Sequence, residues 1–376
     1  MVAKSLNLNP FHYCCFTLIF FLTSSCHVAR YVYWNFADIN DFRKFDADTI
    51  KPSDKPYTFK GLTRSVSIPL QAGFDVKAES HELESFLAVH KTVAFLVIRR
   101  DSLIFEHYFD GYTRESVLPS FSLSKSFVSA LIGIAIGEKI IGSLDQPVTD
   151  FLPEMADSGF RNVTLRNLLE MRSGINFNEG YNSPFGEMAK FYYGLNLKKY
   201  TMNLRTAGNP GEEYSYQSAN TEILALILER ATGKPLYQYM EEKLWKPMGA
   251  NKEASWSVDS KKYNEVKAFC CLNATALDFA KFGQLYLDHG IFDGDTVVPP
   301  EWVRESLTIR NNSRDSQGFP YTYHWRVTDE GDFFAKGILG QYIYVSPEKK
   351  IVIVRFGKKS TDLVWARFFR ELINEL

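Results

Sequence analysis

The chain has 376 residues, of which 45% are hydrophobic, 15% aromatic and 23% charged, a composition typical of a folded globular protein. Its 43 basic and 44 acidic residues give a net charge of −1. This balance, without a basic stripe or a nucleic-acid recognition module, excludes an electrostatic nucleic-acid binder.

The first 26 residues have the order of an export signal. Lys4 precedes a short apolar run, Phe16–Leu22, and small polar residues then lead to Cys26. The run is shorter than the roughly 20 apolar residues of a membrane-spanning helix. We predict a lipoprotein-like signal over residues 1–26, with Cys26 as the lipidated residue, although Leu22 lies one position earlier than the usual pattern. A plain cleaved signal, an uncleaved anchor and a buried N-terminal segment are the alternatives.

The remaining chain is predicted to be an arm followed by one large domain. Residues 27–78 are polar and interrupted by prolines, which predicts an extended arm. Residues 79–376 form the domain, which begins with a β-hairpin over Thr92–Tyr112. Helical periodicity then prevails over about 122–288.

Three segments near the C-terminus are predicted to be strands of an antiparallel meander. They read "YTYHWRVTD" from Tyr321, "DFFAKGILGQYIYV" to Val345 and "KKIVIVRFG" to Gly357. An amphipathic helix starting at Thr361 follows. We therefore predict an α+β fold, with one antiparallel sheet built from both chain ends, flanking helices and a mostly helical insertion over about 122–288.

Beyond the predicted signal, the chain has two cysteines, the adjacent Cys270 and Cys271. Disulfides between neighbouring cysteines are strained and rare, so we expect two small buried hydrophobic side chains instead. The sequence contains no CxxC or HExxH motif and no histidines at ligand spacing. No metal or other cofactor is therefore expected.

The strongest candidates for catalysis lie at the start of an apolar helix. Ser122 and Lys125 are three residues apart, which places both side chains on one helix face. A serine hydroxyl becomes nucleophilic when a base takes its proton, and a buried lysine can be that base. The helix start adds N–H groups and partial positive charge for an oxyanion. The same spacing at Ser346–Lys349 lies in a predicted turn, where we expect a structural role.

Three Tyr-x-Asn/Ser stretches could supply a third proton-handling group, and they begin at Tyr33, Tyr181 and Tyr216. Tyr33 lies in the arm, and Tyr181 lies in a loop with no helix after it. Tyr216 lies between a Pro-Gly turn and a helix, where its ring can be held in place. We favour Tyr216, because an ammonium group beside a phenolate stabilises it.

Glycines interrupt the predicted strand "AKGILGQYIYV". Gly337 and Gly340 are poor strand residues and indicate a close approach of backbone to a ligand. A backbone N–H at this edge could complete an oxyanion hole, and a β-bulge is the alternative explanation.

Together these stretches resemble the motifs of the class C β-lactamase-like serine hydrolases, which are related to penicillin-binding proteins. The motifs are Ser122-Leu123-Ser124-Lys125, Tyr216-Gln217-Ser218 and the glycine-containing strand, in that order. The resemblance covers about Glu79 to Leu376 and includes "LRNLLEMRSGI" and "FAKFGQLYLDHG".

The resemblance implies roles for individual residues. Ser122 would be the acylated nucleophile, with Lys125 and Tyr216 as the pair that moves its proton. Ser218 would orient Lys125 or bind substrate. The oxyanion hole would consist of the backbone N–H of Ser122 and one near Ile338.

The third motif departs from that of β-lactamases and penicillin-binding proteins, in which the cation of Lys-Thr-Gly holds a substrate carboxylate. The strand here reads "GILGQ" over 337–341, and Lys336 is out of register. The chain is therefore more similar to the aminohexanoate-dimer hydrolase and carboxylesterase branch. The candidates for substrate or oxyanion contact in this strand are Gly337, Ile338, Gly340 and Gln341.

We predict an exported serine hydrolase of the cell envelope or periplasm, anchored to the membrane through its N-terminus. It would cleave a small-molecule ester or amide through an acyl-enzyme on Ser122. A weak β-lactamase or D-alanyl-D-alanine peptidase is the alternative enzyme, and the missing cation disfavours it. A non-catalytic binding protein on the same fold is disfavoured because Ser122, Lys125 and Tyr216 are all present. A Ser-His-Asp hydrolase is disfavoured because no G-x-S-x-G motif occurs.

Overall fold

The computed structural model describes residues 27–61 and 83–376 of the chain. The predicted signal over residues 1–26 and the later part of the predicted arm, 62–78, lie outside the described residues. Within the described part, the largest sheet has seven strands. From edge to edge these are β10 (Arg326–Val327), β11 (Phe333–Gly337), β12 (Gln341–Ser346), β13 (Ile351–Gly357), β3 (Thr92–Arg99), β4 (Ser102–Tyr108) and β2 (Lys60–Gly61).

The two ends of the domain meet in the middle of this sheet. β13 pairs antiparallel with β3, from Ile351 opposite Arg99 to Gly357 opposite Thr92. β3 and β4 form the hairpin predicted over Thr92–Tyr112. All neighbouring strands are antiparallel except β2 and β4, which run parallel. The predicted α+β fold, with a sheet built from both chain ends, is confirmed.

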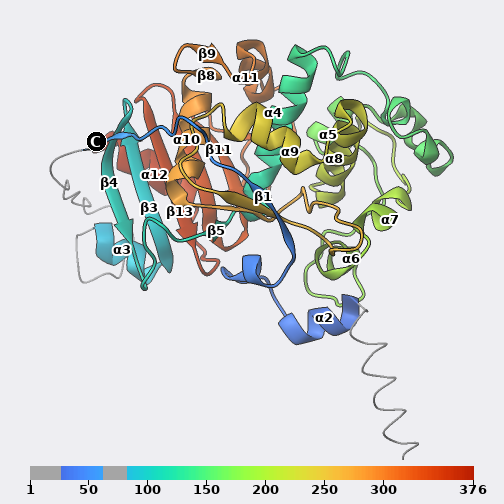
Figure 1. The fold of residues 1–376 in the computed structure, drawn as a ribbon, viewed down its shortest axis with the longest axis horizontal. Coiled ribbons are helices and arrows are strands. Elements are labelled where there is room, and N and C mark those ends of the chain that lie inside the picture. The colour runs from blue at the N-terminus through green and yellow to red at the C-terminus, as the bar shows by residue number, and fades with distance from the viewer. Residues whose placement is uncertain (1–26, 62–82) are drawn as a thin grey trace, which may run out of the picture.

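The central strands are buried on both faces, which explains their unbroken apolar sequences. Along β3, Phe95 and Val97 pack with helices α3 (Leu83–Val89) and α12 (Trp365–Asn374). Leu96 and Ile98, which alternate with them, join the larger core on the opposite face. α10 (Ala276–Leu287) lies against that face on β12 and β13. The sheet therefore separates two apolar layers (Figure 1).

Most of the remaining helices form a helical layer beside the sheet (Figure 1). No helix in the described part of the chain is long and apolar enough to cross a membrane. The helices outside those named above are α2 (His27–Trp34), α4 (Ser124–Gly137), α5 (Leu165–Leu169), α6 (Glu187–Tyr193), α7 (Leu197–Met202), α8 (Ser218–Thr232), α9 (Leu236–Met240) and α11 (Pro300–Leu307).

The N-terminal arm is more structured than its sequence predicted. It contains helix α2, which packs on α6 (Figure 1). It also contributes β1 (Ala47–Ile50), which pairs antiparallel with β6 (Ala254–Ser257). The prediction of an extended arm is wrong over α2, which is helical, and β1 is an extended strand; contacts with residues far along the chain stabilise both segments. The small second sheet has the strand order β1, β6, β7 (Leu272–Ala274) and β5 (Leu118–Pro119).

The segment predicted as one strand up to Val345 is two strands joined by a tight turn. A 3-10 turn, η7 (Ile338–Gly340), separates β11 from β12. Leu339 and Gly340 have φ angles of 64° and 86°, in the left-handed region that ends a strand. The last helix starts at Trp365, four residues later than predicted. The predicted meander is otherwise present as β10 to β13.

Candidate active site

Ser122 lies where a short 3-10 turn, η2 (Phe121–Leu123), leads directly into α4. Helix α4 is buried from Ser124 to Ala135, so the core holds it rigidly. Ser122 itself is half-buried between two buried neighbours. Phe121 has a φ of 45°, an unusual conformation for a bulky residue, and such backbone strain is concentrated at functional sites. The helix start thus presents one reachable hydroxyl on a fixed frame.

The ammonium group of Lys125 makes three hydrogen bonds in the buried space beside Ser122. Its Nζ donates to Ser122 Oγ at 3.1 Å, to Ser218 Oγ at 3.2 Å and to the carbonyl of Phe269 at 2.7 Å. The residue is only 2% exposed. A lysine ammonium has three donors, so these contacts satisfy it without water. The lysine that the sequence placed in a core helix is held against the serine by three partners.

A carboxylate extends this chain of contacts. Glu179 accepts the hydroxyl of Ser218 at 2.6 Å and the backbone N–H of Ser218 at 2.7 Å. Tyr181 also donates to Glu179, at 2.8 Å. Ser218, at the start of α8, therefore connects a negative charge to the Lys125 ammonium. Such a charge stabilises the cation and fixes the direction of its hydrogen bonds.

Tyr216 lies on the other side of Lys125. The Lys125 Nζ is 5.2 Å from the centre of the Tyr216 ring. The ring also packs edge-on against Tyr321, with centroids 5.9 Å apart, and lies 5.7 Å from the guanidinium carbon of Arg326. Arg326 is buried and forms an ion pair of 2.8 Å with Asp315. Two cations thus flank the phenol ring.

The glycine-containing segment approaches the nucleophile through its backbone. A Cβ on Gly337 would lie 2.5 Å from the Ser120 carbonyl oxygen and 3.2 Å from the Phe121 Cβ, so only glycine fits there. This contact brings Ile338, the next residue, beside the turn that carries Ser122. Gly337, the last residue of β11, thus approaches the turn that carries Ser122 closely, whereas the predicted approach of this backbone to a ligand stays a prediction.

Two other candidates in this segment hold the turn in place. The Gln341 side chain bridges to Gly357, donating to its carbonyl at 3.1 Å and accepting its N–H at 2.7 Å. The carbonyl of Gly340 accepts a hydrogen bond from buried Arg355. The side chain of Gln341 is thus engaged within the sheet and is not free to bind substrate, which revises the role expected for it.

Lys336 does not occupy the position of a substrate-binding cation. Along β11, Ala335 belongs to the same core as α4, whereas Phe334 packs with α12. Because strand residues alternate, Lys336 starts on the Phe334 side. Its Nζ donates to Gln317 at 2.7 Å. Burial, reinforced by the Arg326 charge, lowers the pKa of Lys336 to about 8.

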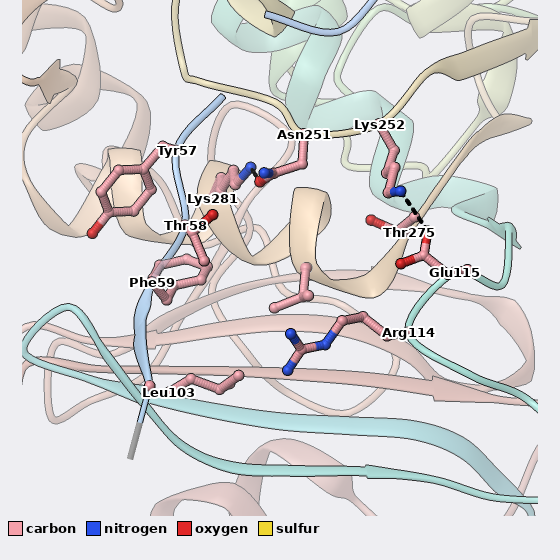
Figure 2. A pocket seen from close by; sticks show the side chains of 12 residues that line it. Tyr57, Thr58, Phe59, Leu103, Arg114, Glu115, Asn251, Lys252, Thr275 and Lys281 are labelled. Carbon is pink, nitrogen blue, oxygen red and sulfur yellow. Dashed lines mark hydrogen bonds and ion pairs between the residues drawn. The ribbon is translucent and has the colours of Figure 1, made fainter. Parts of the chain in front are cut away.

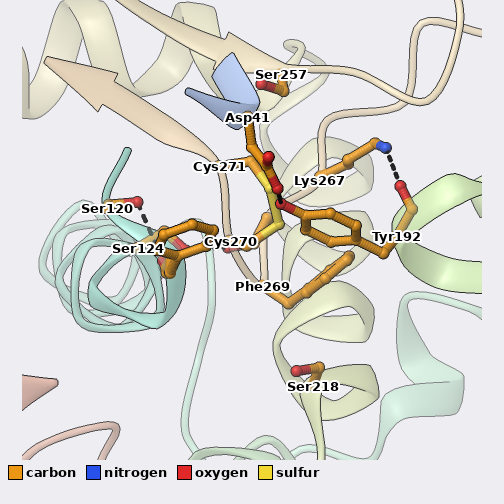
Figure 3. The surroundings of a disulfide bond; sticks show 12 residues. Asp41, Ser120, Ser124, Tyr192, Ser218, Ser257, Lys267, Phe269, Cys270 and Cys271 are labelled. Carbon is orange, nitrogen blue, oxygen red and sulfur yellow. Dashed lines mark hydrogen bonds between the residues drawn. A yellow bond between two sulfur atoms is a disulfide. The ribbon is translucent and has the colours of Figure 1, made fainter. Parts of the chain in front are cut away.

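Cys270 and Cys271 form a disulfide, which corrects the expectation of two free thiols (Figure 3). Both are buried, as expected. Trp256 donates to the carbonyl of Cys270 at 2.8 Å, and Ser257 donates to that of Cys271 at 3.0 Å. These contacts fix the backbone that holds the sulfurs together, and no sequence pattern records them. The bond directly follows Phe269, whose carbonyl holds the lysine.

A buried histidine lies near the site but is used structurally. His324 is 1% exposed, and its ring nitrogens lie 3.2 Å from Thr221 Oγ1 and 3.3 Å from the Tyr321 hydroxyl. Burial, with the charges of Lys125 and Arg326, lowers its pKa well below the usual value. His324 is therefore neutral and held between two hydroxyls.

The second Ser-x-x-Lys copy has a different environment. Ser346 ends β12 and is fully buried. Lys349 lies in the turn before β13, where it pairs with Glu348 at 3.6 Å. The lysine of this copy therefore lies in the turn expected from the sequence, whereas its serine is the last residue of a strand.

A cavity of about 340 Å³ lies away from these residues (Figure 2). The arm residues Tyr57 and Phe59 line one side, and Lys252 pairs with Glu115 at 2.6 Å on another. Its lining includes neither Ser122 nor the side chains around it. We assign this cavity no part in the chemistry.

Sequence reasoning missed Glu179 and Phe269 and set Tyr181 aside. Glu179 reaches Ser218 across 39 residues of sequence, through a loop without periodicity. The acidic residue beside a second Tyr-x-Ser stretch, in "EGYNS", was the available signal. Phe269 donates no side-chain hydrogen bond: it holds Lys125 through its carbonyl, which leaves no trace in the sequence, and its ring centre lies 5.8 Å from Lys125 Nζ.

The fold and the site define a β-lactamase-fold hydrolase. The chain belongs to the Beta-lactamase family, whose profile matches residues 83–364. It is 30% identical over 299 residues to a 6-aminohexanoate-dimer hydrolase of Paenarthrobacter ureafaciens, covering 73% of this chain and 75% of that protein. It is 26% identical over 208 residues to the esterase EstB of Burkholderia gladioli, covering 52% of this chain and 53% of that protein.

Solved structures share the fold at low sequence identity. A candidate 6-aminohexanoate-dimer hydrolase from Bacillus anthracis superimposes with a TM-score of 0.75 at 23% identity, over 92% of this chain and 93% of that one. A class C β-lactamase mutant gives a TM-score of 0.62 at 15% identity, over 78% and 95%. The predicted resemblance to this family is confirmed.

Proposed function

We propose that the protein is a serine hydrolase that cleaves a small ester or amide through a covalent acyl-enzyme on Ser122. The observation that carries this proposal is the 3.1 Å contact between Lys125 Nζ and Ser122 Oγ at the start of a buried helix. Burying the Lys125 ammonium costs free energy, because charges are poorly solvated in a core. A buried lysine held against a serine is therefore a candidate for a functional role. The hydrolases among its relatives support the same class of reaction.

In this mechanism Ser122 Oγ attacks the carbonyl carbon of the substrate, and its proton passes to the Lys125–Tyr216 pair. The backbone N–H groups of Ser122 and Ile338 stabilise the oxyanion, and the start of α4 adds partial positive charge. Collapse of the tetrahedral intermediate expels the alcohol or amine, which Tyr216 protonates. Water then attacks the acyl-enzyme by the same route and releases the acid.

The side chain of Ser218 acts as the link between Glu179 and Lys125 in this scheme. Glu179 holds Ser218 through two hydrogen bonds, and Ser218 holds Lys125. These three residues keep the ammonium pointed at Ser122 through the cycle. Glu179 and Ser218 are positioning residues, because they act through the lysine.

A short fluorophosphonate probe tests the proposal directly. Ser122 Oγ should displace fluoride from the probe, so wild-type protein should gain the mass of one probe less HF on Ser122, measured by intact mass and peptide mapping. Ser122→Ala should not be labelled. Ser346→Ala is the matched control, because it removes the serine of the second Ser-x-x-Lys copy, and it should be labelled as fast as wild type. Equal labelling of Ser122→Ala and wild type would refute the assignment.

A β-lactam or D-alanyl peptide substrate is disfavoured by the state of the nearby cations. Lys336 is bound to Gln317, and Arg326 is paired with Asp315. Both cations are thus already engaged by protein side chains, which makes them poorer partners for the carboxylate that such substrates present. Nitrocefin should therefore give no acylation burst at concentrations at which a neutral ester is turned over.

We also propose that the protein is exported and anchored to the membrane through Cys26. Support comes from the sequence of residues 1–26 alone. Metabolic labelling with a palmitate analogue should mark the wild-type protein in the membrane fraction and leave Cys26→Ala unmarked and released. Equal labelling of both would contradict lipidation at this residue.

A further inference from the structure

An apolar cavity of about 220 Å³ lies between the N-terminal arm and the turn beside the nucleophile. The arm provides one wall, including Tyr31, Phe36 and Ala37. Ile338 and Leu339, from the η7 turn, provide the opposite wall. None of the residues that line this cavity is charged. We call this space the arm cavity.

Two of the residues that line the arm cavity, Ile338 and Tyr181, connect it to the site around Ser122. Ile338 directly follows Gly337, which packs closely against the Ser120 carbonyl and Phe121 Cβ at the start of the η2 turn that carries Ser122. Tyr181, on another side, is bonded to Glu179 and so belongs to the network that holds Lys125. The turn that carries the proposed oxyanion donor, Ile338, therefore also forms part of the wall of this cavity.

The arm is a fixed wall, because side-chain contacts fasten it to the domain. Arg30 donates to the carbonyl of Tyr193 at 2.9 Å, and Tyr31 donates to that of Tyr181 at 2.8 Å. The rings of Tyr31 and Trp34 pack on Tyr193, with centroids 5.7 and 6.0 Å away. The cavity is therefore a feature of the folded arm, which the sequence predicted to be merely extended.

The geometry points to a binding site for the acyl chain of an uncharged ester or amide, an inference that rests on the proposed function. The walls are mostly aromatic and aliphatic, with Asn35 and Ser360 as neutral polar members, so they favour alkyl groups and would leave a substrate charge without a charged partner. A cavity of about 150 Å³ holds benzene, so one of this volume takes a chain of about eight carbons.

The acyl chain, rather than the leaving group, is assigned to the arm cavity. The leaving group must depart beside the proton donor, Tyr216. That ring faces Tyr321 and Arg326, and none of these three residues lines the cavity. The acyl chain then extends past Ile338 while the alcohol or amine leaves toward Tyr216.

The test is a series of p-nitrophenyl esters from acetate to decanoate. For wild type, kcat/KM should rise with chain length up to about octanoate, by up to about fourfold per buried methylene, and then level off. Ala37→Phe adds bulk inside the cavity and should lower the octanoate-to-acetate ratio of kcat/KM at least tenfold. Val32→Phe is the matched control, since Val32 is 69% exposed on the same arm and is not a lining residue. Its ratio should equal that of wild type.

The second part of the test replaces the neutral octanoate ester by the p-nitrophenyl monoester of octanedioate. This substrate has the same length and a terminal carboxylate. Its kcat/KM should be at least tenfold lower. The inference is overturned if wild type prefers acetate, if Val32→Phe lowers the ratio as much as Ala37→Phe, or if the charged ester is the better substrate. Fluorophosphonate labelling of Ser122 distinguishes failure of the proposed function from failure of this inference. If Ser122 is not labelled, the proposed function is wrong. If Ser122 is labelled but kcat/KM does not depend on chain length, only the acyl-chain site in the arm cavity is wrong.

Discussion

At the scale of single residues, the site depends on how one buried cation is held. Lys125 has a hydroxyl, a second hydroxyl and a carbonyl as partners, and none of these carries a charge. The negative charge that balances it comes from Glu179, one hydrogen bond further away through Ser218. In the mechanism that we propose, Lys125 exchanges a proton with Ser122, and its three hydrogen-bond partners include no carboxylate that would hold the ammonium directly.

Glu179→Gln should therefore slow catalysis while substrate binding is retained. The amide keeps a hydrogen-bonding oxygen for Ser218 but removes the charge that stabilises the ammonium, so kcat should fall by roughly tenfold while KM changes little. The pH profile of kcat/KM should also move along the pH axis, because a charge near the proton-transferring pair is lost.

The control for this variant is Glu213→Gln, an exposed glutamate in the segment before Tyr216. It should leave both kcat and the pH profile as in wild type. A uniform loss of rate in Glu179→Gln with an unmoved profile would mean that Glu179 only supports the loop.

The sequence identified Ser122, Lys125 and Tyr216 as candidates because spacing and helix position are local properties. Glu179 and the carbonyl of Phe269 could not be found this way, since tertiary folding alone brings them to Lys125. The strained backbone at Phe121 is equally invisible, because a phenylalanine gives no reason to expect a positive φ. Local patterns thus indicate which groups react, and long-range contacts determine what holds them.

At the scale of elements, the turn between β11 and β12 positions the proposed oxyanion donor. Periodicity predicted an unbroken strand there, because apolar residues flank the glycines on both sides. The break arises where the Gly340 carbonyl accepts from Arg355, a fully buried residue that also donates to Thr92 and His90. A buried arginine from a neighbouring strand therefore sets the turn.

Gly340→Ala should destabilise the protein strongly. A Cβ at Gly340 would collide with the Arg355 guanidinium, and the residue has a φ of 86°. Displacing a buried charged group from its partner costs about 3 kcal/mol or more. Thermal unfolding should show a large fall in Tm, with loss of esterase activity in the folded fraction.

Gly294→Ala is the matched control for that variant. Gly294 has the same φ of 86°, but nothing lies within 4 Å of the Cβ it would gain. The free energy of unfolding should fall only by the cost of placing alanine in the left-handed region, about 1 kcal/mol. Equal losses in the two variants would show that Arg355 yields freely and does not set the turn.

The disulfide is a second element-scale device, and it should affect catalysis more than stability. It closes a loop between adjacent residues, so it removes little entropy from the unfolded chain. It follows Phe269 (Figure 3). The carbonyl of Phe269 accepts a hydrogen bond from Lys125. Cys270→Ser/Cys271→Ser should therefore lower kcat by roughly tenfold through a misplaced lysine, with a small change in Tm.

The matching experiment treats wild type with dithiothreitol and counts free thiols by mass after alkylation. Reduction to two thiols should reproduce the rate of the double serine variant, and reoxidation should restore the wild-type rate. The double serine variant itself should not respond to the reductant. Unchanged kcat in both the reduced protein and the variant would show that the bond does not fix the lysine.

At the scale of the whole molecule, the sheet joins the two ends of the domain, and the helical layer carries most of the candidate catalytic residues. The sequence predicted this plan because β-rich stretches with clear turns lie at both ends of the domain. It did not predict α2 or the second sheet, whose β1 segment has little strand character and is stabilised by pairing with β6. The arm thus becomes part of the substrate cavity that we infer.

Buried carboxyl groups next to α8 couple the stability of the molecule to pH. Glu265 is 5% exposed, and burial together with the neighbouring Glu229 raises its pKa to about 8 from an ordinary value of 4.5. The pKa of Glu229 is also raised by burial. Between about pH 4.5 and 8, the folded protein therefore keeps a proton on Glu265 that the unfolded chain has already released.

Stability should consequently fall as pH rises through that range. Because the folded state binds more protons than the unfolded state, the free energy of unfolding decreases with pH, by at most about 1.4 kcal/mol per pH unit for one proton. Glu265→Gln keeps a neutral side chain at every pH, so its Tm should fall less than that of wild type between pH 5.5 and 8.5. Glu253→Gln, at an exposed glutamate, should follow wild type. Parallel Tm curves for Glu265→Gln and wild type would mean that Glu265 is already ionised in the folded protein at pH 5.5.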